Sequence, residues 1–344
     1  MAASGSRKST IVRSFTLAGF RALDLAAPSV GAALVERIWF RIPRGMPLAE
    51  PTGTPFEVRW QGRTLRGQVW GSGPVVYLVH GWGGNADQMR GFVAPLVASG
   101  FRVVAHDAPS HGRSDAGRHG AESSDAVELG QALDAVATEF GPAHTIVAHS
   151  LGTLATLLAL RDGWFTAERL VLIAPVDGVP WFTAYFRRLL GFGDRTQRHT
   201  DRRIERRTGY RPDELETRLL ATQLERPELL VVHDLDDRSP GMGVAADLVA
   251  GWPGAGLVET TGLGHNRVLA DPGVIGSVVD FVLDDRLLVQ PSATSAGLPA
   301  EEPSGHQGDH DRERRQDRQG RDGRGRTLAA HHHVEHAVVQ VPQR

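Results

Sequence analysis

Apolar residues between residue 55 and about residue 285 fall into short, nearly continuous runs that alternate with helical patterns. Such runs are typical of central parallel strands covered by helices on both faces. The order predicts an α/β fold, with a doubly wound, mostly parallel sheet flanked by helices. The predicted strands are Phe56–Trp60, Arg63–Trp70, Val75–Val79, Phe101–Ala105, Thr145–Ala148, Leu170–Ile173, Leu229–Val232 and Leu257–Glu259, the first two joined as a hairpin by Gln61-Gly62. The predicted helices span about 86–98, 121–138, 151–161, 242–250 and 273–283.

One interval breaks this alternation and predicts a small helical cap, inserted at about residues 176–227. It is too long for a simple crossover, and its helical stretches (about 181–190, 198–208 and 212–224) have no strand between them. Nine arginines lie between Arg187 and Arg211, against three acidic residues. They have two interpretations: a solvated helix face, or a surface that attracts anionic substrates or a partner.

The first 50 residues predict an N-terminal helical arm. Apolar positions such as Phe15, Phe20, Leu34 and Trp39 have amphipathic spacing, so the arm is expected to pack on the body of the protein. Peripheral contact with a membrane surface and a poor export signal are the alternatives. Arg21 and other charged residues interrupt the apolar stretch before it reaches signal-peptide length, and no run approaches the roughly 20 apolar residues of a membrane span.

The last residues, about 288–344, predict a disordered low-complexity tail after a catalytic domain at about 51–287. Between Glu301 and Arg326 there is no Val, Ile, Leu, Met, Phe, Trp or Tyr, and seven acids balance seven arginines. Such a segment buries too little apolar surface to offset its ordering entropy. The segment His331–His336 does not have the His-Glu-x-x-His spacing of a helical zinc site, so no metal is predicted.

Charge and cysteine content restrict the possible functions. The chain has 38 Lys and Arg against 40 Asp and Glu, so no strong overall field favours nucleic acid as a partner. The absence of cysteine excludes disulfides, thiolate metal sites and a cysteine nucleophile. A cytoplasmic location is our expectation, and the oligomeric state is left open.

Ala148-His149-Ser150-Leu151-Gly152 is the strongest local motif. It lies between a predicted strand and a predicted helix, which is the context of a nucleophile elbow: a tight turn that lifts a serine hydroxyl above the sheet. The turn requires small residues two before and two after the serine, and Ala148 and Gly152 meet this requirement. Ser150 is therefore the predicted nucleophile.

A second motif, His80-Gly81-Trp82-Gly83-Gly84, directly follows a predicted strand. Glycines let a loop bring its backbone N–H groups close to a substrate, where they stabilise a developing oxyanion. A phosphate-binding loop is the alternative, but neither G-x-G-x-x-G nor a P-loop lysine is present.

Together these motifs resemble the α/β-hydrolase superfamily over about residues 55–285, which implies an eight-stranded sheet. The resemblance implies that the backbone N–H groups of Trp82 and Leu151 form the oxyanion hole. The segment Asp107–Ser114 resembles the family's Asp-x-Pro-Gly-His-Gly-x-Ser loop, with Ser110 where glycine is usual, and receives no catalytic role.

The same resemblance implies the other two catalytic residues. His233–Pro240 is similar to the family's His-Gly-x-x-Asp segment, whose register selects Asp237 as the acid, with Asp234 and Asp236 as competitors. Gly262-Leu263-Gly264-His265 matches the family's Gly-x-Gly-His loop after the last strand, so His265 is the expected base.

The expected activity is hydrolysis of a carboxylic ester or related small acyl substrate through a covalent acyl-enzyme, with no cofactor. Thioesters, amides, lactones and a carbon–carbon bond beta to a carbonyl are alternative substrates on the same residues. A non-catalytic binding member of the fold is the alternative of another class. Four aromatic residues of the cap either line the substrate pocket or pack the cap onto the body: Trp181, Phe182, Tyr185 and Phe186.

Overall fold

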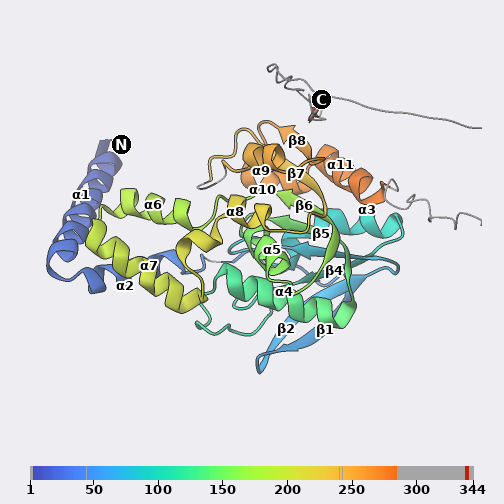
Figure 1. Ribbon diagram of the computed structural model, residues 1–344, viewed down its shortest axis with the longest axis horizontal. Coiled ribbons are helices and arrows are strands. Elements are labelled where there is room, and N and C mark those ends of the chain that lie inside the picture. The colour runs from blue at the N-terminus through green and yellow to red at the C-terminus, as the bar shows by residue number, and fades with distance from the viewer. Residues whose placement is uncertain (1–2, 44, 240, 242, 285–337, 341–344) are drawn as a thin grey trace, which may run out of the picture. The chain divides into compact units, whose positions relative to one another are not determined.

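The computed structural model describes residues 3–43, 45–239, 241, 243–284 and 338–340. A single sheet has the strand order β1-β2-β4-β3-β5-β6-β7-β8-β9 (Figure 1). β1 and β2 form an antiparallel hairpin, β2 is antiparallel to β4, and the remaining neighbours are parallel. The strands are β1 Thr54–Trp60, β2 Arg63–Trp70, β3 Val75–Val79, β4 Arg102–His106, β5 Ala143–His149, β6 Ala167–Ile173, β7 Glu228–Asp234, β8 Gly256–Thr260 and β9 Val338–Gln340.

The eight predicted strands and the mostly parallel sheet are confirmed. Observed ends extend beyond the apolar runs by up to three residues, as in β6, because ladder hydrogen bonds continue past the buried side chains. The ninth strand, Val338–Gln340, pairs with β8 and differs from the disordered tail predicted for these residues. The rest of the predicted tail, with His331–His336, lies outside the described residues.

The β1–β2 hairpin has the two-residue turn that the sequence predicts. Gln61 and Gly62 have φ angles of 48° and 76°. Positive φ at both central positions is the requirement of a type I′ turn, whose twist matches that of the flanking strands.

Helices cover both faces of the sheet because alternate strand residues point in opposite directions. Val76, Leu78 and Val103 pack with η1, α3 and α11 on one face, whereas Tyr77 and Val104 belong to the core that includes α4, α5 and α9. These helices are η1 Ala86–Phe92, α3 Val93–Ala98, α4 Ala126–Phe140, α5 Leu151–Arg161, α9 Ala245–Gly251 and α11 Pro272–Leu283, with short α10 Gly264–Arg267 and η3 Val268–Ala270 before α11.

The interval between β6 and β7 forms the helical cap and contains no strand among its described residues. It consists of α6 Val179–Leu190, α7 Asp194–Thr208, η2 Pro212–Leu215 and α8 Thr217–Thr222. Gly191 and Gly209, both in the left-handed region, end α6 and α7. Glycine is favoured there because it has no Cβ to clash.

The N-terminal arm consists of α1 Ala3–Ala26 and α2 Pro28–Trp39, which lie beside α6 and α7 (Figure 1). Phe20 and Val35 from the arm form a small buried core with Leu190 and Phe192 from the cap. The arm therefore packs mainly on the cap, not on the body that the sequence analysis expected. Its apolar residues share this core with the cap, and Gly31 lets α2 approach Thr196 of α7 closely. In the described part of the chain, no helix combines the length and apolar character needed to cross a membrane.

Several cap arginines hold the arm and the body in place. Arg203 pairs with Glu36 of α2 at 2.5 Å, and Arg195 donates to the carbonyl of Leu25. Arg207 reaches the body and is nearly buried there. These arginines fit neither predicted interpretation, because their charges are used in internal contacts.

Candidate active site

Ser150 lies in the turn between β5 and α5, with φ 53° and ψ −123°. A non-glycine residue rarely adopts positive φ, and such strain is typical of functional positions. The turn is crowded: a Cβ on Gly152 would lie 2.7 Å from the His80 carbonyl oxygen, and one on Gly81 would lie 2.8 Å from the Ser150 Cβ. Glycine at these two positions lets the strand ends and the serine approach closely.

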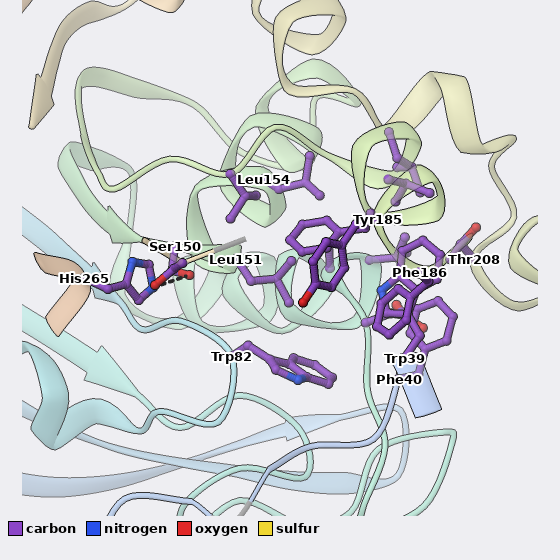
Figure 2. A pocket seen from close by; sticks show the side chains of 18 residues that line it. Trp39, Phe40, Trp82, Ser150, Leu151, Leu154, Tyr185, Phe186, Thr208 and His265 are labelled. Atoms are coloured by element: carbon purple, nitrogen blue, oxygen red, sulfur yellow. Dashed lines mark hydrogen bonds between the residues drawn. The ribbon is translucent and has the colours of Figure 1, made fainter. Parts of the chain in front are cut away.

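The structure brings Ser150, His265 and Asp237 into one hydrogen-bonded chain. His265 Nε2 lies 3.0 Å from Ser150 Oγ, and His265 Nδ1 lies 2.7 Å from Asp237 Oδ2. Figure 2 shows the side chains of Ser150 and His265 next to each other. The three residues come from the ends of three different strands, separated by up to 115 positions in the chain. All three lie at the carboxyl edge of the sheet, where functional loops of open α/β sheets gather.

Asp237 is well placed to stay ionised. Its side chain is only 1% exposed, and burial acts to raise its pKa. Hydrogen bonds from the Ser239 N–H, at 2.8 Å, and from His265 outweigh burial, so the pKa of Asp237 is lowered. A charged Asp237 accepts a hydrogen bond from His265 Nδ1–H, which leaves Nε2 as the acceptor facing Ser150.

The two competing aspartates lie elsewhere. Asp234 is buried at the end of β7 and accepts from Thr260 Oγ1 at 2.7 Å and from the Leu263 and Gly264 N–H groups. Asp236 accepts from the Gly262 N–H at 2.8 Å. Both therefore fix the loop that carries His265 without contacting the imidazole.

The loop after β3 presents Trp82 toward the site. The N–H groups of Gly81, Gly83 and Gly84 each have an acceptor, whereas the Trp82 N–H has none among the described residues. Leu151 is the first residue of α5, where backbone N–H groups lack an intrahelical acceptor. The two N–H groups named from the sequence thus belong to backbone positions beside Ser150 that are suited to donate hydrogen bonds to an anionic oxygen.

Buried neutral histidines fix the loops around the site. His80 Nε2 accepts from the Ala108 N–H at 3.0 Å, and His111 Nε2 accepts from the Gly83 N–H at 3.2 Å. Burial lowers the pKa of both rings to about 4, so they stay uncharged at neutral pH. His149, whose pKa burial lowers to about 3, packs against the His265 ring and donates to the His265 carbonyl oxygen at 3.0 Å.

A cavity of about 340 Å³ opens beside Ser150 and His265 (Figure 2). Its walls are mostly aromatic and aliphatic, and they come from the body, the cap and the arm. Its lining residues are Trp39, Phe40, Trp82, Asp125, Ala126, Val127, Ser150, Leu151, Leu154, Val176, Val179, Phe182, Tyr185, Phe186, Thr208, Leu215, Ser239 and His265.

Of the four predicted pocket residues, Phe182, Tyr185 and Phe186 line this cavity. Trp181 is not part of the wall; its indole stacks on the ring of Tyr185, with centroids 5.3 Å apart. At about 100° per residue the four side chains span an arc of about 140° on α6, and Trp181 lies at one edge of this arc.

The sequence analysis missed the part of the wall that the arm contributes. Trp39 and Phe40 lie at the end of the cavity opposite Ser150 (Figure 2). The Trp39 ring stacks on Phe40 and on Phe186, with centroids 5.3 Å apart in both pairs. The only sequence signal was the aromatic pair at the end of an amphipathic helix, and nothing local connects it to the serine.

A buried ion pair supports this end wall. Arg207 Nε lies 3.0 Å from Asp125 Oδ2, with side-chain exposures of 9% and 2%. The guanidinium also lies 4.2 Å from the centroid of the Phe40 ring and donates to Ser123 and to the Ser124 carbonyl oxygen. The pair ties cap helix α7 to the start of α4 and holds Phe40 in the wall.

One group in the described part of the chain has the side chains of a metal site. Ligand atoms of His119, Asp125 and Glu128 lie within 4.8 Å of one another. However, Asp125 already pairs with Arg207, and Glu128 accepts from Arg118. Arginine thus supplies the positive charge that a metal ion would provide.

Residues 76–314 match the family model described as the alpha/beta hydrolase family. The chain belongs to this family. A pimeloyl-[acyl-carrier protein] methyl ester esterase from Methylococcus capsulatus is 38% identical over 114 residues, or 33% of this chain and 41% of that protein. A non-heme haloperoxidase from Rhodococcus erythropolis is 38% identical over 66 residues, covering 19% of this chain and 24% of that protein. The matches thus span less than half the length of these relatives.

Solved structures of the same fold include Est1E from Butyrivibrio proteoclasticus, which holds ferulic acid, with a TM-score of 0.52 at 16% identity. That comparison covers 68% of this chain and 98% of Est1E. A putative lipase from Acinetobacter baumannii has a TM-score of 0.52 at 18% identity, over 73% of this chain and 95% of its own. At these identities the likeness shows the fold alone. The chain therefore has the fold of the alpha/beta hydrolase family, to which its sequence assigns it.

Proposed function

We propose that this alpha/beta hydrolase is a serine esterase that cleaves a neutral ester with an apolar acyl or alcohol group. The observation that carries the proposal is the hydrogen-bonded chain of Ser150, His265 and Asp237 beside an apolar cavity that Ser150 and His265 line. Strain at Ser150 and the free N–H of Trp82 add support, because both are typical of acyl transfer sites.

In the proposed mechanism, His265 Nε2 takes the hydroxyl proton as Ser150 Oγ attacks the ester carbonyl. The resulting oxyanion accepts hydrogen bonds from the N–H groups of Trp82 and Leu151. His265 returns the proton to the departing alkoxide, which leaves an acyl group on Ser150. Water, deprotonated by His265, then releases the acid, while Asp237 stabilises the imidazolium in both steps.

The preference for a neutral substrate follows from the charges in the wall. Apart from His265 and the phenol of Tyr185, Asp125 is the one ionisable side chain among the described residues that line the cavity, and it is paired with Arg207. No unpaired arginine or lysine lines the cavity in the described part of the chain. A substrate carboxylate buried there would lack a partner and would be costly to desolvate. The volume lies at the lower end of small-molecule sites, which suits a short to medium acyl chain or a single aromatic ring.

The test is labelling with a fluorophosphonate probe, together with turnover of p-nitrophenyl esters of graded acyl length. Ser150→Ala should lose labelling and reduce kcat by about 10³-fold or more, because an elbow alanine has no nucleophile. Ser239→Ala removes another serine of the cavity and should keep labelling. Labelling that persists in Ser150→Ala, or a preference for carboxylate-bearing esters, would contradict the proposal.

A further inference from the structure

The N-terminal arm exposes an unusual amount of apolar surface. Exposed large apolar side chains in the described part of the chain concentrate in residues 15–48, with only four others elsewhere. Those of the arm and the segment after it are Phe15, Leu25, Val30, Leu34, Ile38, Met46 and Leu48. Scattered single residues of this kind are ordinary, whereas a concentration marks an interaction surface.

On α2 these side chains form a continuous row. Val30, Leu34 and Ile38 are four residues apart, so they lie on one side of the helix, and they are 51%, 40% and 46% exposed. The side that carries Val35, fully buried, packs against the cap. The helix thus uses one apolar side for folding and leaves a second one uncovered.

The exposed charges of the arm itself are positive. Arg37 is exposed on α2 beside this row, Arg21 is exposed on α1, and Arg41 pairs with the exposed Glu122 of the body at 3.7 Å. The two acidic residues between positions 14 and 43 are turned inward. Asp24 accepts from the Thr196 N–H at 2.7 Å, and Glu36 pairs with Arg203. The outer surface of the arm therefore combines apolar side chains with arginines and carries no exposed acid over the described residues 14–43.

From this arrangement we infer that the arm docks on an anionic lipid surface through Val30, Leu34 and Ile38, with Arg21 and Arg37 facing the headgroups. An apolar helix face flanked by basic residues is the composition of helices that lie in a membrane interface. A symmetric dimer through the same face would bring like charges together, because an isologous interface places each patch against itself. Charge complementarity favours the lipid.

The position of α2 connects this surface to the cavity. Trp39, the last residue of α2, forms part of the end wall, one residue after the exposed Ile38. The helix that rests on lipid thus also borders the space that takes the apolar group of the substrate. This connection rests on the proposed function, whereas the docking itself does not require turnover.

Co-sedimentation of the full chain with vesicles tests the inference. We expect binding to phosphatidylcholine vesicles that contain phosphatidylglycerol, and weak binding to phosphatidylcholine alone. Each arginine near an anionic surface contributes about fivefold in affinity, so Arg21→Gln with Arg37→Gln should weaken binding by about 25-fold. High salt should reduce the difference between wild type and variant, because exposed charges are screened.

A matched pair of double variants tests the apolar row. Leu34→Asp with Ile38→Asp should weaken vesicle binding by more than about tenfold, because two charged side chains replace apolar ones that insert into the lipid interface. Leu219→Asp with Leu283→Asp changes leucines that are 37% and 43% exposed outside the arm, and should bind like wild type. Turnover of a short water-soluble ester should be unchanged in both, which verifies folding.

Three results would overturn the inference. They are equal loss of binding in the two double variants, no sedimentation of wild type with anionic vesicles, and a dimer that dissociates in Leu34→Asp with Ile38→Asp. Should the aspartates prevent folding, the arginine double variant still decides, since Arg21 and Arg37 are exposed and their replacement leaves the core intact. Because sedimentation does not measure catalysis, its failure is distinct from failure of the esterase proposal.

Discussion

At the scale of single residues, two aspartates three positions apart have different tasks. Asp237 contacts His265, whereas Asp234 holds the N–H groups of the loop that carries His265. Both are buried and both have a lowered pKa, since hydrogen bonds to each carboxylate outweigh the effect of burial. The two carboxylates thus have similar environments, and their tasks differ only because they lie next to different hydrogen-bond donors.

Substituting each aspartate by asparagine should separate these tasks. Asp237→Asn should lower kcat by about 10³- to 10⁴-fold, because an amide no longer holds the imidazole tautomer that leaves Nε2 free, while the melting temperature changes little. Asp234→Asn places an NH₂ group against N–H donors, so it should lower the melting temperature by several degrees and kcat less. Steady-state kinetics and thermal melts of both variants provide the check. A larger loss of kcat in Asp234→Asn would reassign the acid.

Trp39 offers a prediction about substrate length. Trp39→Ala removes an indole from the end of the cavity opposite Ser150, so acyl chains too long for wild type should gain room. We expect the preferred p-nitrophenyl ester to shift to longer chains and short-chain kcat/KM to fall by less than about tenfold, since the reacting atoms are untouched. Trp181→Ala is the matched control, because Trp181 lies outside the wall. If Trp39→Ala leaves the dependence of turnover on acyl-chain length unchanged, the arm does not border the substrate site.

At the scale of elements, the cap is held on the body by a few specific contacts. Helix α7 contacts α2 on the arm side and reaches the start of α4 through Arg207. The arm, cap and body therefore meet around one ion pair. Because this ion pair is buried, removing one of its two residues should strongly lower the free energy of unfolding.

Arg207→Gln should destabilise the protein by about 3 kcal/mol, because it leaves Asp125 buried without its cation. It should also raise KM, since Phe40 loses the guanidinium that packs on its ring. The double variant with Asp125→Asn should recover part of the stability. Arg202→Gln, at an exposed position of the same helix, is the control and should be within about 0.5 kcal/mol of wild type. Urea denaturation measures all four proteins, and equal effects of Arg202→Gln and Arg207→Gln would contradict the role of the ion pair.

At the scale of the whole molecule, buried histidines couple stability to pH. Burial lowers the pKa of His80 and His111 to about 4, and that of His106 and His149 to about 3. In the unfolded chain each titrates near about 6.5. Because the folded pKa is lower, the unfolded state binds more protons as the pH falls, and stability decreases.

We therefore expect stability to be fully present above about pH 6.5 and to fall steeply toward pH 4, by about 1.4 kcal/mol per pH unit for each histidine. Urea denaturation at several pH values checks this. His106→Phe keeps an aromatic ring that cannot be protonated, and should reduce the number of protons taken up on unfolding by about one. Equal stability at pH 7 and pH 5 would show that these rings are not held neutral by the fold.

The sequence by itself determined the eight central strands, the cap and the motifs around Ser150 and His265. Short apolar runs report burial directly, and the elbow requires small residues within five positions, so both are local signals. Tertiary structure alone decided what surrounds them. It placed the arm on the cap, brought Trp39 and Phe40 into the cavity, excluded Trp181 and paired Arg207 with Asp125. These contacts join residues far apart in the chain, and no periodicity or motif specifies which apolar face or which charge becomes the partner of another until the chain is folded.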